Sequence, residues 1–242
     1  MIVANLESLL GYKFEDPTLL ERAVTHRSWA HENLPGESDE KLRESQNESL
    51  EFVGDSVLGL VIAEQVFIKH PKLSEGDLTL MKHHLVSMTT LSRIAQSLRL
   101  GEFVRVGRGE EKTGGRKKLA ILADTLEAVI AAVFFDGGYE AASLFITRIF
   151  EREIEVVTPQ SSLDYKTLLQ ETLQAERLSA PVYSLIRTEG LPHARTFFVE
   201  AAWNTGKSQG TGGSIKSAEM MAASEALKTL QQPKLKSSKR KD

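Results

Sequence analysis

Residues 47–67, NESLEFVGDSVLGLVIAEQVF, are the stretch that most constrains the fold. On an α-helix, spacings of three and four residues stack on one face, so Glu48, Glu51 and Asp55 share one stripe. The rest of this helix is apolar nearly all round, which predicts a buried helix. Buried carboxylates are tolerated when they bind cations, are protonated or meet basic partners. A metal site is the sharpest of these hypotheses.

A second predicted helix has the same character. Residues 119–135, LAILADTLEAVIAAVFF, carry only two charges, Asp124 and Glu127, which lie three residues apart on one face. Two such helices facing each other would form a cluster of carboxylate oxygens, which suits Mg²⁺ or Mn²⁺ better than zinc or copper. The alternative is a network of buried salt bridges. It is disfavoured because neither stretch contains a Lys or Arg.

The two acidic stretches resemble the signature pair of bacterial ribonuclease III, an endonuclease of double-stranded RNA. NESLEFVGD and ILADTLEAVIAAVFFDGG occur in the order that the family has, and GRGEEKTGG between them is similar to its GxGExxxGG segment. The resemblance implies that Glu51, Asp55, Asp124 and Glu127 are metal ligands, with Asp55 and Glu127 as catalytic residues. It also implies that Glu48 is an auxiliary acid.

The family resemblance further implies hydrolysis by water that leaves 5′-phosphate and 3′-hydroxyl ends. Two divalent ions about 4 Å apart can activate the water, stabilise the transition state and assist the leaving oxygen. The family works as a homodimer that cuts both strands and leaves a short 3′ overhang. Phe52 projects beside the acidic stripe and looks like the aromatic residue that enters a socket on the partner subunit, an isologous contact.

From residue 163 the pattern changes to α-β-β-β-α. An amphipathic helix (LDYKTLLQETLQAERL) precedes two strand-like pieces (PVYSLIRTEG and ARTFFVEAAWN), the glycine-rich KSQGTGGS and an alanine-rich helix. This order, with the KTLLQE opening and the AAxEAL ending, is similar to the double-stranded RNA-binding domain. The resemblance implies that Gln170, Gln174 and His193 contact the minor groove and that Lys216 meets phosphates. Ile215 departs from the pattern, because the family usually has two adjacent basic residues here.

The expected architecture is therefore a mainly α nuclease domain at 1–158, a small α+β double-stranded RNA-binding domain at 159–232 and a basic disordered tail at 233–242. Thr158 to Ser162 are the expected hinge. Charge follows the same division. Residues 161–242 hold 12 Lys and Arg against 8 Asp and Glu, net +4, which leaves net −7 for residues 1–160 of a chain whose total is −3. This asymmetry suggests that one part binds metal and the other a polyanion.

Composition excludes several other classes. With no cysteine, the chain has neither disulfides nor thiolate metal sites. The opening MIVANLESLLGYKFEDP has no signal-peptide pattern, and the apolar run at 119–135 is too short and too acidic for a membrane span. We expect a soluble, cytoplasmic protein whose partners are double-stranded RNA and a second copy of itself, with no membrane and no small-molecule cofactor.

Other residues are given structural roles. His26, in the Thr25-His26-Arg27-Ser28 step that also resembles the family, is expected to be a hydrogen-bonded packing residue. His83 and His84 lack a metal-site spacing. Residues 33–46 are expected to be a polar loop, and residues 101–118 are too rich in glycine and charge for a regular element. Within the latter stretch, basic side chains could meet an RNA backbone. They are Lys112, Arg116, Lys117 and Lys118.

Two rival functions differ in class. The first is a noncatalytic binder of duplex RNA with a degenerate nuclease domain, which the presence of all four expected carboxylates disfavours. The second is a metal-dependent phosphohydrolase of small nucleotides. Such an enzyme has no need of the C-terminal RNA-binding pattern.

Overall fold

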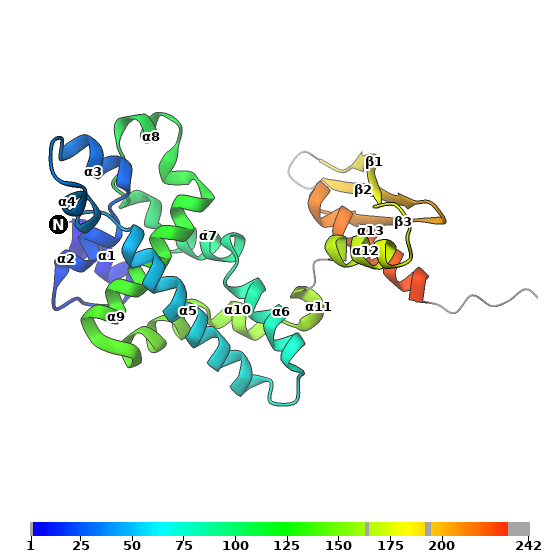
Figure 1. Ribbon diagram of the computed structural model, residues 1–242, viewed down its shortest axis with the longest axis horizontal. Coiled ribbons are helices and arrows are strands. Elements are labelled where there is room, and N and C mark those ends of the chain that lie inside the picture. Colours follow the sequence, from blue (N-terminus) through cyan, green and yellow to red (C-terminus); the bar gives the residue numbers. More distant parts are fainter. Residues whose placement is uncertain (1, 163–164, 192–194, 232–242) are drawn as a thin grey trace, which may run out of the picture. The chain divides into compact units, whose positions relative to one another are not determined.

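The computed structural model describes residues 2–162, 165–191 and 195–231, and divides the chain into two compact units, Met1–Ser162 and Leu163–Asp242. The first unit is helical, and the second contains an antiparallel sheet with helices (Figure 1). The predicted fold class is confirmed. The basic tail beyond residue 231 lies outside the described residues.

The first unit is built from α-helices of very different lengths, with two short 3₁₀ turns. The helices are α1 Ile2–Leu10, α2 Pro17–Ala23, α3 Arg27–Asn33, α4 Asp39–Glu44, α5 Glu48–Lys69, α6 Glu75–Leu85, α7 Met88–Ser97, α8 Arg108–Lys112, α9 Leu119–Ile149, α10 Glu151–Val156 and α11 Pro159–Ser162. The 3₁₀ turns are η1 Leu100–Glu102 and η2 Gly115–Lys117. Both acidic stretches are thus helical, as predicted.

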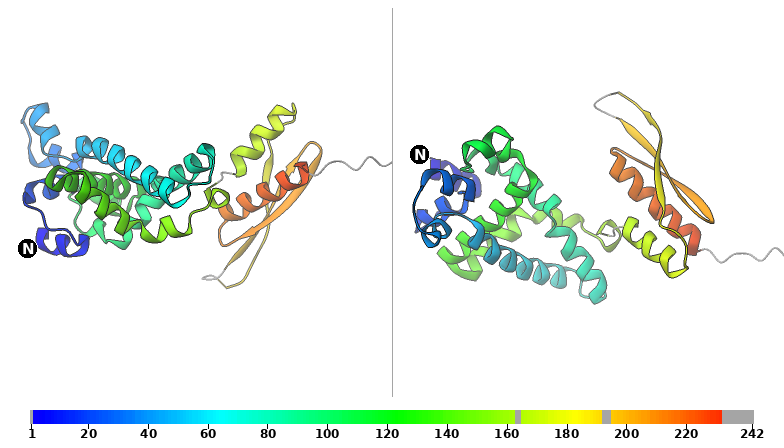
Figure 2. Two further views of the ribbon diagram at one scale, coloured as in Figure 1. Left: turned by 90° about the horizontal axis from the view of Figure 1, so that it is seen from below. Right: turned by 45° about the horizontal axis from the view of Figure 1, so that its top comes forward.

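Helices α5 and α9 pack against each other and form the centre of this unit (Figures 1 and 2). Leu58 and Ile62 of α5, and Leu126 and Ile130 of α9, are fully buried in the same cluster of apolar side chains. Helix α7 packs on α9, as does α2. The carboxylates of the two acidic stretches are therefore carried by the two most central helices.

The C-terminal part of α9 changes direction at Gly138. This residue has φ +75°, a conformation that favours glycine and interrupts the helical backbone. Just before it, Asp136 accepts hydrogen bonds from the Tyr12 hydroxyl at 2.8 Å and from the backbone amides of Glu15 and Asp16. Burial, followed by the neighbouring Asp136 carboxylate, raises the pKa of Tyr12 to about 12. The kink is thereby tied to the segment between α1 and α2.

Several segments expected to be irregular form short helices instead. Within the predicted polar loop, Ser38 accepts a hydrogen bond from the amide of Lys41 and so begins α4. The glycine-rich segment contains η1, α8 and η2, and the expected hinge contains α11. Side chains from distant parts of the chain hold α8 in place, as when Glu32 pairs with Arg108 at 3.1 Å. Such partners are not visible in local spacing.

The second unit has the predicted α-β-β-β-α order. Its elements are α12 Tyr165–Ala175, β1 Val182–Glu189, β2 Thr196–Trp203, β3 Gly206–Gly212 and α13 Ile215–Gln231. The strands form an antiparallel sheet in the order β1-β2-β3, with a bulge in β1 between Leu185 and Arg187. Helix α13 packs on β2 and β3, and α12 packs on α13 around buried Leu169 and Leu173 (Figure 1).

None of the described helices combines the length and the hydropathy that spanning a bilayer requires.

Candidate active site

The positions of five acidic residues follow from the two central helices. Glu48 and Glu51 lie in the first turn of α5, and Asp55 lies one turn further along. Asp124 and Glu127 lie one turn apart near the start of α9. The two helices pack against each other, with Gly54 of α5 lying against the backbone of Glu127 in α9, so the acidic faces of the two helices meet.

Three of these carboxylates form a compact group. One oxygen each from Glu51, Asp124 and Glu127 lie within 4.8 Å of one another, and all three side chains are half-buried. The structure thus brings together three of the four predicted metal ligands. Asp55 is exposed and outside this group, although its charge acts on Glu51 and Glu127.

Burial and mutual repulsion make these carboxylates hold protons tightly. Burial, followed by the charges of Asp55, Glu51 and Asp124, raises the pKa of Glu127 to about 8. Burial also raises the pKa of Glu51, with further contributions from neighbouring acids, and it raises the pKa of Asp124. Such shifts mean that the fully ionised cluster is costly on its own.

The donor set suits a hard divalent cation. All the converging atoms are carboxylate oxygens, the ligands that magnesium and manganese prefer, and positive charge would offset the repulsion among them. Among the described residues, the ion pairs include Arg27 with Glu48 at 3.2 Å, but none involves Glu51, Asp124 or Glu127. A salt-bridge network therefore does not account for the cluster.

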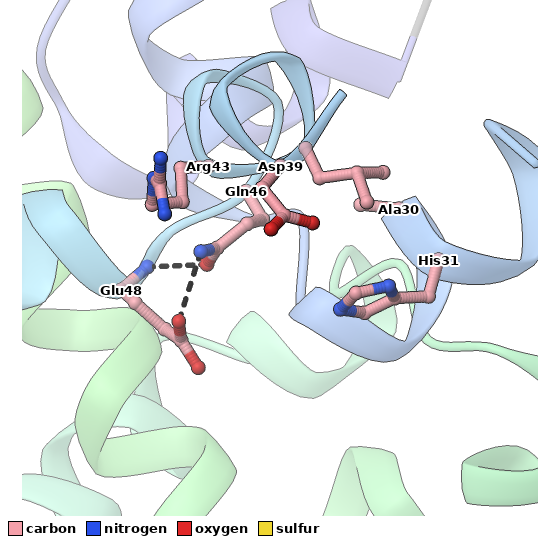
Figure 3. Close-up of a pocket in the computed structure, with 7 residues that line it drawn as sticks. Ala30, His31, Asp39, Arg43, Gln46 and Glu48 are labelled. Atoms are coloured by element: carbon pink, nitrogen blue, oxygen red, sulfur yellow. Dashed lines mark hydrogen bonds between the residues drawn. The ribbon is translucent and has the colours of Figure 1, made fainter. Parts of the chain in front are cut away.

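Glu48 lies at the edge of the cluster, where its side chain is already engaged. Besides the ion pair with Arg27, it accepts a hydrogen bond from Gln46 Nε2 at 2.9 Å, while its backbone amide donates to Gln46 Oε1 at 2.7 Å (Figure 3). A pocket of about 270 Å³ adjoins it. The pocket is lined by Ala30, His31, Asp39, Leu42, Arg43, Gln46 and Glu48.

The glycine-rich segment before α9 has its own ion pairs. Lys118 contacts Glu110 at 2.5 Å, and Arg116 contacts Glu111 at 2.6 Å. Two of the four basic residues expected to be available for RNA thus have acidic partners. Lys112 and Lys117 are exposed, and no ion pair involves them in the described part of the chain.

The prediction that α5 is buried nearly all round is wrong. Phe52 is 76 % exposed, and Leu60, Phe67 and Ile68 on the same helix are each more than half exposed. Helix α9 covers one side of α5, and in the described part of the chain no element covers these four side chains fully. An apolar face of this kind is typical of a surface that contacts another molecule.

The histidines lie outside the group of converging carboxylates, as expected for residues with a structural role. His26 precedes α3 and bonds Ser28, and it is half-buried. His83 and His84 lie exposed in the last turn of α6, outside the acidic group.

In the second unit, those predicted RNA-contacting residues that the structure describes are exposed. Gln170 and Gln174 lie one turn apart on α12, and Lys216 lies in the first turn of α13 beside Ile215, which is 45 % exposed. His193 lies outside the described residues. The two helices are joined by an ion pair between Lys166 and Glu219 at 2.6 Å.

Sequence reasoning missed two contributors to this site. Gln46 is buried and hydrogen-bonds both the backbone amide and the carboxylate of Glu48. A glutamine before a helix does not by itself indicate such a role. Gly54 lies where α5 meets α9, and a Cβ at this position would overlap the backbone carbonyl of Glu127. A glycine inside an apolar helix was the available signal for close helix packing, although Gly59 on the same helix gives the same signal without such a contact.

A helical domain that gathers carboxylates from two central helices, followed by a domain of α-β-β-β-α order, defines a metal-dependent nuclease of double-stranded RNA. Comparison with known proteins agrees. The "Ribonuclease-III-like" family model matches residues 16–153, and the "Double-stranded RNA binding motif" model matches residues 165–230. The chain belongs to the ribonuclease III family.

Individual relatives span nearly the whole chain. The chain is 45 % identical to "Ribonuclease 3" of Clostridium acetobutylicum over 231 residues, which cover 95 % of this chain and 97 % of the relative. It is 45 % identical to "Ribonuclease 3" of Streptomyces coelicolor over 229 residues, 93 % of this chain and 79 % of the relative. The nuclease domain of ribonuclease III from Campylobacter jejuni superimposes with a TM-score of 0.57 at 38 % identity, covering 64 % of this chain and 99 % of that domain.

The chain is therefore an endoribonuclease of double-stranded RNA. The rival hypotheses of a noncatalytic binder and of a small-nucleotide phosphohydrolase are not favoured, because the named relatives are nucleases and the RNA-binding motif is present.

Proposed function

We propose that Glu51, Asp55, Asp124 and Glu127 bind Mg²⁺, or Mn²⁺ in its place, and that phosphodiester bonds of duplex RNA are hydrolysed at this cluster. The observation that carries the proposal is the convergence of oxygens from Glu51, Asp124 and Glu127 within 4.8 Å. Asp55 supplies a fourth carboxylate, whose charge acts on Glu127 and Glu51. Glu48 is an auxiliary acid, held by Arg27 and Gln46.

The divalent ions, when bound, supply an activated water and neutralise charge that develops on the phosphate and on the leaving 3′ oxygen. The protein's own contribution is a set of fixed oxygens on two packed helices. Glu127 holds its proton at neutral pH in the metal-free protein and must release it to act as a charged ligand. Water attack and departure of the 3′ oxygen give 5′-phosphate and 3′-hydroxyl ends.

The active enzyme in this proposal is a homodimer. The 76 % exposure of Phe52 beside the acidic cluster supports a contact in which this ring enters a socket on a second copy of the chain. The Campylobacter jejuni nuclease domain is described as structurally flexible in a region involved in dimer formation. Two copies would bring two clusters to one duplex, so that both strands are cut and a short 3′ overhang remains.

The second unit provides affinity for the duplex. Gln170 and Gln174 on α12, together with His193 through its resemblance to the family, are proposed to contact the minor groove. Lys216, near the N-terminus of α13, is proposed to meet phosphates, where the helix dipole also favours negative charge. We assign residues 1–158 to catalysis, residues 159–232 to RNA binding and residues 233–242 to a basic tail.

The proposed setting is the cytoplasm, with ribosomal RNA precursors and other structured transcripts as substrates. A direct test incubates the purified protein with a long perfect RNA duplex and with each single strand, with and without Mg²⁺. Cleavage of the duplex alone, dependent on metal and leaving 5′-phosphate ends, is the expected result. Tight duplex binding without cleavage in both Mg²⁺ and Mn²⁺ would overturn the proposal.

A further inference from the structure

The hydrogen bonds around His26 hold its imidazole ring in one orientation. His26 Nδ1 accepts a hydrogen bond from the backbone amide of Ser28 at 3.2 Å. The Ser28 hydroxyl lies 2.8 Å from the same nitrogen and itself accepts a hydrogen bond from the backbone amide of Gly107 at 2.9 Å. Because a backbone amide can only donate, Nδ1 is the acceptor, and the proton of the neutral ring is on Nε2.

The backbone beside the ring is fixed to both acidic helices. The amide of His26 donates to the carbonyl of Arg105 at 3.0 Å, in the segment that leads to α9. The amide of Asn47, which directly precedes α5, donates to the carbonyl of Thr25 at 3.0 Å. Thr25 is buried. His26 is therefore attached to the same framework that positions Glu51 and Asp124.

The Nε2–H group of His26 has no hydrogen-bond acceptor among the described residues. The side chain is half-buried, and Nε2 is not one of the buried polar atoms that lack a partner, so solvent reaches it. Burial lowers the pKa of His26, with Arg27 acting in the same direction, while the nearby charges of Glu110, Asp124 and Glu48 oppose the shift. An N–H donor with a fixed tautomer is thus present where the charges of Glu110, Asp124 and Glu48 act, and a carboxylate cannot itself donate once it is ionised.

We propose that His26 Nε2–H donates a hydrogen bond to a phosphate oxygen of the RNA strand bound at the carboxylate cluster. The inference rests on the proposed function of that cluster as the cutting site. Carboxylates repel a phosphate, so a fixed donor at their edge would offset part of that repulsion. Hydrogen bonds to ionised acceptors are shorter and stronger than those between neutral groups.

The test distinguishes two roles of His26: hydrogen-bond donation by Nε2–H to the RNA, and capping of the N-terminus of α3. His26→Asn keeps a cap, because asparagine is among the most effective N-cap residues, but its amide is too short to reach the position of Nε2. We expect kcat/KM on a perfect duplex to fall roughly 10-fold or more, with an unchanged midpoint of thermal unfolding. His26→Gln, whose amide extends further, restores part of the loss. His83→Asn, at an exposed histidine in the last turn of α6 and outside the acidic group, is the control and leaves kcat/KM unchanged.

The acceptor is identified with substrates that carry single 2′-deoxy nucleotides around the cut. The loss caused by His26→Asn persists on these substrates if the acceptor is a phosphate oxygen, and it disappears if the acceptor is a 2′-hydroxyl, which would overturn the proposal. Full activity of His26→Asn would also overturn it, as would a loss matched by a lower unfolding midpoint and not rescued by glutamine. Cleavage by Glu127→Gln at the normal rate would instead show that the cluster is not the cutting site.

Discussion

Gly54 of α5 lies directly against the backbone carbonyl of Glu127 in α9. A side chain at position 54 would begin with a Cβ that overlaps this carbonyl oxygen, and backbone atoms cannot move aside as the end of a flexible side chain can. The absence of a side chain at Gly54 thus sets how closely the two acidic helices approach. Since Glu51 lies one turn before Gly54, the same contact sets the separation of Glu51 and Glu127.

Gly54→Ala is expected to push the helices apart and disturb the carboxylate cluster. Overpacking of this kind typically costs about 1–3 kcal/mol of stability, and we expect cleavage to fall by at least about tenfold because the oxygens no longer converge. Thermal unfolding and duplex cleavage measure the two effects. Gly59→Ala is the control, because a Cβ there meets only the Lys82 side chain at 3.5 Å and alanine favours the helix. Equal stability and equal cleavage rates of the two variants would contradict the conclusion that Gly54 sets the approach of the two helices.

The raised pKa of Glu127 predicts how the stability of the metal-free protein depends on pH. The folded state keeps the proton up to a pKa of about 8, whereas the unfolded state releases it near the ordinary pKa of 4.5. The stabilising contribution is therefore complete below pH 4.5 and is lost as the pH rises through about 8. In EDTA, the free energy of unfolding should decrease over this interval in the wild type and decrease less in Glu127→Gln. Identical slopes would show that Glu127 titrates normally.

Phe52→Ala should weaken the proposed dimer. Buried aromatic anchors at interfaces are often worth about 2 kcal/mol or more, so we expect the dimer dissociation constant to rise by more than about tenfold. Analytical ultracentrifugation over a range of concentrations measures this. Leu144→Ala, which removes a side chain that is 74 % exposed on α9, provides the comparison. If both variants dimerise like the wild type, Phe52 is not an interface anchor.

Lys216→Ala should weaken duplex binding without changing its sequence preference. Loss of one phosphate contact should lower the slope of log affinity against log salt by about 1 in magnitude. Affinity is measured with a Glu127→Gln background to prevent cleavage. Lys228→Ala, in the last turn of the same helix and ion-paired with Glu225, should leave the salt slope unchanged. A slope unaffected by either substitution would remove Lys216 from the phosphate contacts.

The arrangement of the acidic residues on each helix could be predicted from the sequence, because it depends only on the spacing of residues within that helix. Helical spacing alone puts Glu51 and Asp55 on one face of α5, and Asp124 and Glu127 on one face of α9. Their convergence depends on the packing of two helices that are far apart in the chain. That step came from the family resemblance, because spacing within one helix says nothing about its neighbours.

The elements that were missed depend on distant partners. Helix α8 is held by Glu32, which accepts a hydrogen bond from the amide of Arg108, and by Ser28, which bonds the amide of Gly107. No pattern within the glycine-rich segment indicates these contacts. The exposed side of α5 was missed for a related reason: apolar residues such as Leu60 and Phe67 give the same signal whether the protein's own core or a second molecule covers them.

The measurement that tests the account most directly compares cleavage and binding by Glu127→Gln. Glutamine keeps the size of the side chain but removes the charge that a metal ligand needs. The account predicts that cleavage of a perfect RNA duplex in Mg²⁺ falls by orders of magnitude, while the affinity for the same duplex stays within about twofold of the wild type. Cleavage at the wild-type rate would contradict it, because the carboxylate cluster would then not be the site of hydrolysis.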